Sequence, residues 1–464
     1  MTEPGAYCYS DRDSAQKSAT LCMNILFIIL DGMADRPQRA LGGKTPLEAA
    51  QTPNLDQLAM LGTTGLLTPL APGIPLESET SHFILFGYSL DQFPGRAAFE
   101  AIGRGVEVLP ESVVLLASFA QTTSIDGKVR RDALLWEERQ DGDAEACVAL
   151  SADLALFETQ GITFSLTSCG RCEAILTLTG YPSRDITDVD PFYNDAYVAG
   201  AHPWAESRHP HNAQRTATAL NAYLTWAYRR LQAHPFNRDR QARGLSPVNF
   251  LLTKWAAVRP DVTPFQEQNG LRAASVENYP LYIGIARVCG MTSVSTGHNL
   301  DVAEDFRNKL KTAGKLFEQG YEFVHVHAKG PDVAAHKKDP IGKMKAIQAL
   351  DSVLGPVVEH VRNKSDLLVA VTGDHATPSS GRLIHSGEAI PLLIAGGPNV
   401  LSDDVRAFHE RAVIVGGLGH IRGTDVMPLL LNLTDRVRLH GVRHQKEARP
   451  YWQWQPEPFM VEES

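Results

Sequence analysis

Seven side chains of this 464-residue chain stand out among those of the types that hold divalent cations or act as nucleophiles. Carboxylates and imidazoles without any cysteine suit Mn²⁺ or Zn²⁺ better than a sulfur-rich structural zinc site. A serine hydroxyl beside such cations is a nucleophile suited to phosphoryl transfer. We therefore predict a two-metal phosphoryl-transfer site built from Asp31, Ser78, Asp332, His336, Asp374, His375 and His385.

Two short motifs and one separate histidine supply five of the seven residues. Asp332 and His336 stand four positions apart, so both point to one side of a helical turn. Asp374 and His375 follow an apolar run, and His385 comes ten residues after His375. Taken singly, the first pair reads equally as a solvated helix face and the second as a turn or helix cap. Their combination indicates a metal site.

Ser78 lies between a proline- and glycine-rich loop at residues 71–75 and an apolar stretch. A serine at such a junction commonly caps a helix, and local sequence alone leaves that reading open. In the other reading, a divalent cation makes the hydroxyl a nucleophile near neutral pH, and the helix N-terminus attracts an incoming phosphate. Thr80 and Ser81 are the alternative nucleophiles.

Short apolar runs that stop at these polar residues predict the elements that position them. Such runs are typical of strands buried on both faces of a parallel sheet, whose carboxyl ends carry function in open α/β folds. Amphipathic stretches between the runs predict helices. We expect strands at residues 24–30, 322–326, 367–371 and 390–394, and helices at residues 52–61, 301–319 and 340–361.

The middle of the chain has a different pattern, with hairpin-like strands at residues 113–121, 162–166 and 173–178 and a long helix at residues 213–231. The predicted fold is therefore α/β, with a doubly wound, mostly parallel sheet and an inserted α+β cap domain. We expect an N-terminal tail at residues 1–21, a split catalytic domain at 22–105 and 281–441, an insert at 106–280, and a C-terminal tail at 442–464.

Composition limits the partners of the protein. Hydrophobic residues make up 43% of the chain, as in ordinary globular proteins, and the net charge of −9 argues against nucleic-acid or anionic-lipid binding. The longest apolar run, residues 25–30, is too short to cross a membrane. Six scattered cysteines without a secretion signal predict free thiols and a cytoplasmic protein. The CxxC pattern formed by Cys169 and Cys172 reads as coincidental.

The assembled motifs resemble those of archaeal-type, 2,3-bisphosphoglycerate-independent phosphoglycerate mutases, in the alkaline phosphatase superfamily. The resemblance spans nearly all of residues 23–436 and includes NILFIILDGMADRP, SETSH, ITDVDP, VHAKGPDVAAH, VTGDHATP and IHSGEAIPLLI. It implies that Asp332, His336 and His385 hold one divalent metal, while Asp31, Ser78, Asp374 and His375 hold another. It also implies a phosphoserine at Ser78, with phosphate moving between carbons 2 and 3 of glycerate inside a closed cleft.

The substrate side departs from the family pattern. The arginine-rich element of the family reads Val-Arg-Arg-Asp-Ala-Leu from residue 129, its His-Arg pair is replaced around residues 168–172, and its TRGAG element reads TKWAA from residue 253. The lysine expected at position 283 is isoleucine. Each lost charge-assisted contact would cost about 1.5–3 kcal/mol. The remaining candidates for binding a small phosphorylated acid are Arg130, Arg131, Arg171, Lys254 and Lys329.

Three functions are consistent with this sequence. The first is phosphoglycerate mutase-like isomerisation, a glycolytic reaction, acting on phosphoglycerate or a related phospho-acid. The second is hydrolysis of a phosphomonoester or phosphonate by the same two-metal site, and the third is metal binding without catalysis. Mn²⁺ and Zn²⁺ are the expected cofactors, with Mg²⁺ and Co²⁺ as alternatives. The sequence leaves the oligomeric state open.

Overall fold

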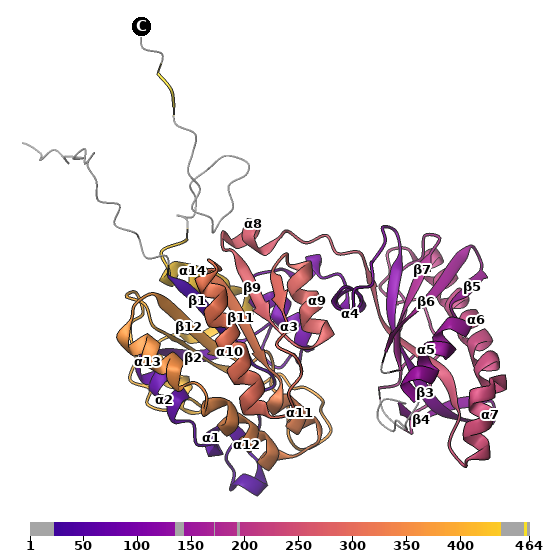
Figure 1. Ribbon diagram of the computed structural model, residues 1–464, viewed down its shortest axis with the longest axis horizontal. Helices are drawn as coiled ribbons and strands as arrows, with labels where there is room; N and C mark the ends of the chain where they lie inside the picture. Colours follow the sequence, from indigo (N-terminus) through magenta and orange to yellow (C-terminus); the bar gives the residue numbers. More distant parts are fainter. Residues whose placement is uncertain (1–22, 135–142, 171, 193–194, 438–458, 462–464) are drawn as a thin grey trace, which may run out of the picture.

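The structure, a computed structural model, describes residues 23–134, 143–170, 172–192, 195–437 and 459–461. The predicted N-terminal tail, most of the predicted C-terminal tail, and Arg171 lie outside these ranges. Two separate β-sheets organise the described chain, and helices α4 and α9 lie between them (Figure 1). Within those ranges, no helix has both the length and the apolar character that crossing a bilayer demands.

The larger sheet confirms the predicted α/β fold. It is parallel throughout except at β13, which runs antiparallel to both of its neighbours. Its central strands are buried on both faces, which explains why they read as continuous apolar runs. The strand order is β10 (Thr292–Val294), β9 (Ala273–Val276), β11 (Phe323–Ala328), β1 (Asn24–Leu30), β12 (Leu367–Thr372), β13 (Ile390–Ala395), β2 (Gly62–Thr68) and β14 (Gly419–Arg422).

Helices cover both faces of this sheet. Leu26 of β1 lines a groove with residues of α10 (Val302–Glu318) and α13 (Gly355–Asn363). Its neighbour Phe27 points to the opposite face, where its ring lies 6.4 Å from that of Phe86, just after α3 (Ser78–Leu85). This alternation along one strand is the mark of a doubly wound sheet. The remaining helices of this unit are α1 (Pro46–Ala49), α2 (Pro53–Met60), α8 (Phe265–Asn269), α9 (Pro280–Val288), α11 (Gly330–His336), α12 (Pro340–Asp351) and α14 (Gly423–Leu433).

The single helix predicted at residues 340–361 is wrong, because the structure has two helices there. The first, α12, ends at Asp351, and α13 starts at Gly355. Pro356 lacks a backbone N–H and disfavours helical backbone in the residue before it, so the pattern cannot continue as one helix. The carboxylate of Asp351 instead accepts hydrogen bonds from the first turn of α2, including Leu55 N at 2.8 Å.

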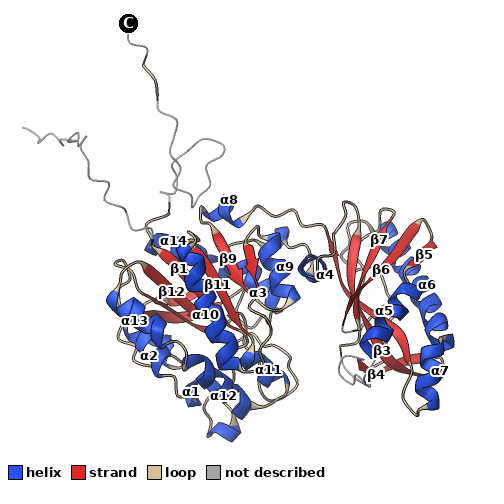
Figure 2. Cartoon of the chain, viewed as in Figure 1, coloured by secondary structure: helices blue, strands red, loops and turns tan. Residues whose placement is uncertain are grey.

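The second sheet is antiparallel and lies in the middle of the chain. Helices α5 (Asp143–Asp153), α6 (Pro210–Ala233) and α7 (Pro235–Ala242) lie on the side of this sheet away from the large sheet (Figure 2). Its other face packs on α4 (Arg96–Gly103) through a small apolar cluster. The strand order is β4 (Lys128–Leu134), β3 (Val113–Ile125), β7 (Glu173–Thr179), β6 (Ile162–Gly170) and β5 (Leu156–Thr159), with β8 (Val248–Val258) also paired to β3.

Two observations favour an end of the insert before the expected residue 280. Strand β9 pairs in parallel with β11 of the large sheet, and Phe265 is buried in the core of that sheet. Because β9 has only four residues, its sequence lacks the long apolar run that marked the other strands. We propose that the insert ends before Phe265.

The cysteines correct another expectation. Cys147 of α5 is bonded to Cys172 as a disulfide, so these two are not the free thiols that the sequence predicted. Spacing could not reveal the pair, because α5 and the residues before β7 meet only in the folded insert. Cys169 and Cys289 are free, so the CxxC pattern is indeed not a bonded pair.

Candidate active site

Adjacent parallel strands bring the predicted ligands to one edge of the large sheet. Strand β1 ends at Asp31, β12 leads into Asp374 and His375, and β11 leads into α11, which carries Asp332 and His336. Carboxyl ends of parallel strands share an edge, so residues that follow them converge. Ser78 reaches the same place as the first residue of α3, and His385 does so from the loop before β13.

Ser78 and three other predicted ligands form one group. His375 Nε2 lies 2.9 Å from Ser78 Oγ, 3.2 Å from Asp374 Oδ2 and 3.6 Å from Asp31 Oδ1. All four side chains are buried, with Ser78 the most exposed at 5%. The structure therefore brings together the set predicted to hold one of the two metals.

The other three predicted ligands form a neighbouring group. His336 Nε2 lies 3.2 Å from Asp332 Oδ2, as the four-residue spacing on a helix predicts, and His385 Nε2 lies 4.0 Å from Asp332 Oδ1. The rings of His375 and His385 stack at 3.7 Å, so the two groups adjoin. No predicted ligand is left outside this pair of groups.

Orphaned atoms show that the residues fit bound cations. One oxygen of Asp31 accepts hydrogen bonds from Tyr282, His327 and Lys329, and one oxygen of Asp374 accepts from backbone N–H groups. The remaining atoms, Asp31 Oδ1, Asp374 Oδ2 and His385 Nε2, are buried without a hydrogen-bond partner. Buried polar atoms are costly to leave unsatisfied. Their convergence is what a metal site requires, since oxygen and imidazole donors suit divalent cations.

Burial and neighbouring charges shift the pKa values of these groups in opposite directions. Burial and the adjacent Asp31 raise the pKa of Asp374 to about 8, whereas burial and His375 lower the pKa of His385 to about 4. Burial opposes charge on Lys329, but Asp31 and Asp332 raise the pKa of Lys329 well above its usual value. A neutral His385 is ready to donate to a cation, and a protonated Asp374 would have to release its proton.

Metal-free protein is expected to lose stability as pH rises from about 6.5 to 9. In this window the folded state still holds protons on Asp374, with a pKa of about 8, and on His327, raised to about 9 by Glu277 and Asp31 against burial. The unfolded chain has already released those protons, so deprotonation disfavours folding. Thermal unfolding of apoprotein across the window checks this, with metal-saturated protein for comparison. Asp374→Asn should flatten the slope, and a rising midpoint would contradict the expectation.

Beside the two groups lies a cleft of about 690 Å³ that reaches the insert. Lys254 of β8 and Lys329 line it, as predicted for substrate contacts. Arg130 and Arg131 are not among its lining residues: Arg131 is buried against Asp190, and Arg130 pairs with Asp132 on the same strand. The substrate contacts expected of Arg130 and Arg131 therefore stay predictions, and Arg171 lies outside the described residues.

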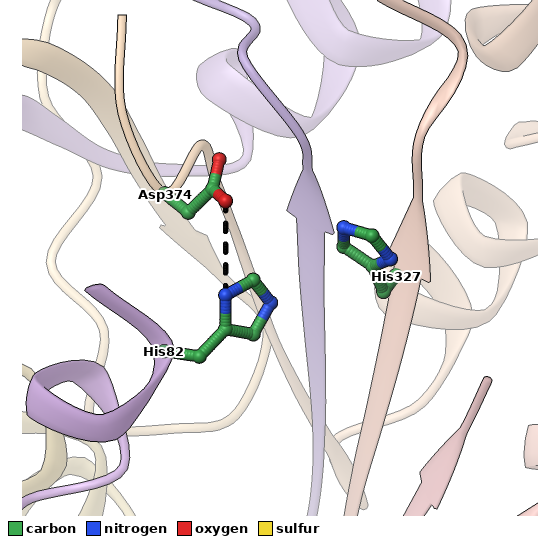
Figure 3. A group of neighbouring side chains, drawn as sticks. All are labelled: His82, His327 and Asp374. Atoms are coloured by element: carbon green, nitrogen blue, oxygen red, sulfur yellow. Dashed lines mark ion pairs between the residues drawn. The ribbon is translucent and has the colours of Figure 1, made fainter. Parts of the chain in front are cut away.

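Sequence reasoning missed the buried histidines behind the site. Figure 3 shows His82 of α3 and His327 of β11 close to Asp374. His82 Nδ1 lies 2.8 Å from the Ser78 carbonyl and 3.7 Å from Asp374 Oδ2. Because Nδ1 donates to that carbonyl, His82 stabilises the first turn of α3. The His-Val-His alternation in β11 was the available signal. His325 of the same strand is buried, and its Nδ1 lies 2.9 Å from Ser275 Oγ.

Sequence reasoning also missed two arginines and one tyrosine. Arg96 and Arg104, at the two ends of α4, line the cleft together with Ser78. The hydroxyl of Tyr282 donates to Asp31 at 2.7 Å. None of the three stands beside a polar motif, so nothing in the local sequence marked them.

Comparisons with known proteins agree with this geometry. The Metalloenzyme superfamily profile matches residues 23–433. A 2,3-bisphosphoglycerate-independent phosphoglycerate mutase from Methanocaldococcus jannaschii is 37% identical, covering 92% of this chain and 97% of its own, and one from Ignicoccus hospitalis is 36% identical, covering 90% and 99%. Among solved structures, a cofactor-independent phosphoglycerate mutase from Thermoplasma acidophilum aligns with a TM-score of 0.60 at 28% identity, covering 89% of this chain and all of its own. The chain therefore belongs to the cofactor-independent phosphoglycerate mutase family of the metalloenzyme superfamily.

Proposed function

We propose that this protein interconverts 2- and 3-phosphoglycerate, or a closely related phosphorylated acid, by passing the phosphoryl group through Ser78. The observation that carries the proposal is the position of the Ser78 hydroxyl, at the N-terminus of α3 and 2.9 Å from His375. A helix N-terminus favours an incoming phosphate. Relatives with this named activity over about nine-tenths of the chain support the substrate. Because such a substrate is small and soluble, we also propose a cytoplasmic location.

Membership of the metalloenzyme superfamily implies bound metal ions, and we propose two per chain. The oxygen and nitrogen donors favour Mn²⁺ or Zn²⁺, with Mg²⁺ and Co²⁺ as alternatives. Such cations, when bound, neutralise phosphate oxygens and make a nearby hydroxyl more acidic. We assign Asp332, His336 and His385 to one cation, and Asp31, Ser78, Asp374 and His375 to the other.

The groups of the chain itself account for the transfer. Ser78 Oγ attacks phosphorus in line, and the bond from phosphorus to the acid's oxygen breaks. Ser78 becomes phosphorylated, and the proton lost from its hydroxyl is balanced by one taken up by the departing oxygen of the acid. The acid's other hydroxyl then attacks the phosphoserine and restores the free serine. Lys329, held between Asp31 and Asp332, supplies a fixed positive charge beside the transferring group. The acid must stay in the cleft and water must stay out, or hydrolysis would compete.

Hydrolysis by the same site is the second candidate, because one feature of the cleft favours it. Its arginines are already matched by carboxylates: Arg96 pairs with Glu77 and Glu79, and Arg104 with Glu173. Arginines whose charges are already neutralised bind a released acid more weakly. The acid then leaves the cleft, and water takes the phosphoryl group from the phosphoserine.

Incubating the metal-loaded enzyme with 3-phosphoglycerate separates the two candidates. The proposal expects 2-phosphoglycerate to accumulate to equilibrium while free phosphate stays at the level of an enzyme-free control. Phosphorus NMR follows both products in one sample. Free phosphate appearing as fast as 3-phosphoglycerate disappears would establish the hydrolase instead.

A further inference from the structure

Beyond the metal ligands, a continuous series of ion pairs runs along the wall of the cleft. Glu79, the neighbour of Ser78, pairs with Arg96 at 3.1 Å, and Arg96 also lies 3.7 Å from Glu100. Glu100 in turn pairs with Arg104, and Arg104 Nη2 lies 2.5 Å from Glu173. This cleft ladder leads from the nucleophile to strand β7 of the insert.

The cations of the cleft differ in how firmly they are held. Lys254 pairs with the fully buried Asp190, and Lys329 with the buried Asp31 and Asp332. The guanidinium of Arg96 stacks 3.8 Å above the ring of Trp255 and pairs with buried Glu79. Each of these three cations has a buried carboxylate as a permanent partner.

Arg104 is held differently, because it pairs with one buried carboxylate on its own helix and with one half-buried carboxylate on the insert. The Glu173 side chain is 24% exposed, and it belongs to the insert, whereas Glu100 belongs to α4 itself. A guanidinium has five N–H donors in a planar fork that matches a carboxylate, so Arg104 can exchange one carboxylate for another without losing its charge compensation.

Helix α4, which ends next to Arg104, packs on the sheet of the insert and also on α9, the helix that leads to the metal ligands. Helices α4 and α9 cross so closely that only glycine fits at the contact. A Cβ added to Gly103 would lie 1.8 Å from the carbonyl oxygen of Pro280, and a Cβ added to Gly284 would lie 1.8 Å from the carbonyl oxygen of Phe99. Tyr282 of α9 in turn donates to Asp31 at 2.7 Å.

We propose that Arg104 is the specificity residue that recognises the carboxylate of the substrate, and that Glu173 occupies this position until substrate displaces it. The inference rests on the proposed function, since it needs a phosphorylated acid whose phosphate lies at Ser78. The bidentate fork then selects acids from other phosphomonoesters, and the exchange frees the insert from its ion pair with α4.

Two compounds that share a phosphate and differ in the carboxylate test the proposal. In 3-phosphoglycerate the far carbon is a carboxylate, and in sn-glycerol 3-phosphate it is a hydroxymethyl group. For Arg104→Met, KM and the calorimetric Kd for 3-phosphoglycerate should rise about 10- to 100-fold, with kcat changed less, because a charge-assisted contact is lost. The inhibition constant and Kd for glycerol 3-phosphate should stay within about threefold. Arg104→Lys should recover part of the acid selectivity.

Glu173→Gln is the complementary variant. It removes the competing charge but keeps the shape, so KM for 3-phosphoglycerate should fall about three- to tenfold while glycerol 3-phosphate is unaffected. The matched control is Glu322→Gln, which neutralises the Arg436–Glu322 pair, similarly half-buried and outside the cleft lining. That control should leave both compounds unchanged.

Equal loss of affinity for both compounds in Arg104→Met, or no loss for either, would overturn the assignment and leave the pair as a structural bridge. Weaker binding of 3-phosphoglycerate by Glu173→Gln would overturn the exchange. Failure of the proposed function has another signature: wild-type enzyme would form no 2-phosphoglycerate, while the calorimetric comparison of the two compounds would still report on Arg104.

Discussion

Replacing Ser78 with alanine is expected to lower the rate of phosphoglycerate interconversion by at least about 10⁴-fold, as loss of a nucleophile does in other covalent mechanisms. The hydroxyl is the only proposed acceptor of the phosphoryl group, and it lies 2.9 Å from His375 Nε2. Stopped-time assays with 3-phosphoglycerate measure the loss. Mass spectrometry of quenched wild-type enzyme should show a phosphorylated peptide that contains Ser78, and the variant should show none.

Ser81→Ala is the matched control for this substitution. Ser81 lies in the same helix, is fully buried, and has a hydroxyl without a hydrogen-bond partner, so its removal should leave turnover within about threefold of wild type. The comparison also separates the two serines as candidate nucleophiles. Parental turnover by Ser78→Ala, with a collapse in Ser81→Ala, would move the nucleophile one turn along the helix.

The convergence of the metal groups could be predicted because it follows from local signals. Each ligand stands at the end of a buried apolar run or at helical spacing from another ligand, and parallel strands bring such positions together. Asp31 after β1 and Asp374 after β12 are the plainest cases, since the two strands are direct neighbours. The resemblance to a known family then divided the seven residues between two cations.

The substrate wall could not be predicted, because it depends on how the insert meets the large sheet. Arg104 and Glu173 lie far apart in sequence and carry no motif, and only the packing of α4 against the insert brings them together. Arg130 and Arg131, chosen by family resemblance, instead pair with acids within the insert. Charge type alone does not say which acid a buried arginine will meet.

The helix break before Gly355 and the Cys147–Cys172 disulfide were missed for different reasons. A proline inside an amphipathic pattern signals a boundary, so Pro356 was a local cue that could have divided the predicted helix. The disulfide has no local cue, because its two cysteines are 25 residues apart and meet through tertiary packing. Local chemistry in the sequence is therefore readable, whereas pairings across the folded insert are not.

Removing the divalent cations with a chelator is expected to abolish turnover, again by at least about 10⁴-fold, and adding Mn²⁺ should restore it. Without cations the carboxylates of Asp31 and Asp332 would face an incoming phosphate dianion with only Lys329 to offset the repulsion. Because burial and Asp31 raise the pKa of Asp374 to about 8, metal rebinding at neutral pH should also release a proton. A pH indicator in weakly buffered solution records that release.

Metal content distinguishes loss of one cation from general damage. Asp332→Asn should lower bound metal from about two ions per chain to about one, because it weakens the group that includes His336 and His385 and spares the group around Ser78. Asp404→Asn, which removes a fully exposed carboxylate, should leave both ions in place. If the demetallated enzyme kept full turnover, the seven residues would have to act as acids, bases and hydrogen-bond donors alone. The oxygens Asp31 Oδ1 and Asp374 Oδ2, buried without a hydrogen-bond partner, would then lack the compensation that a cation supplies.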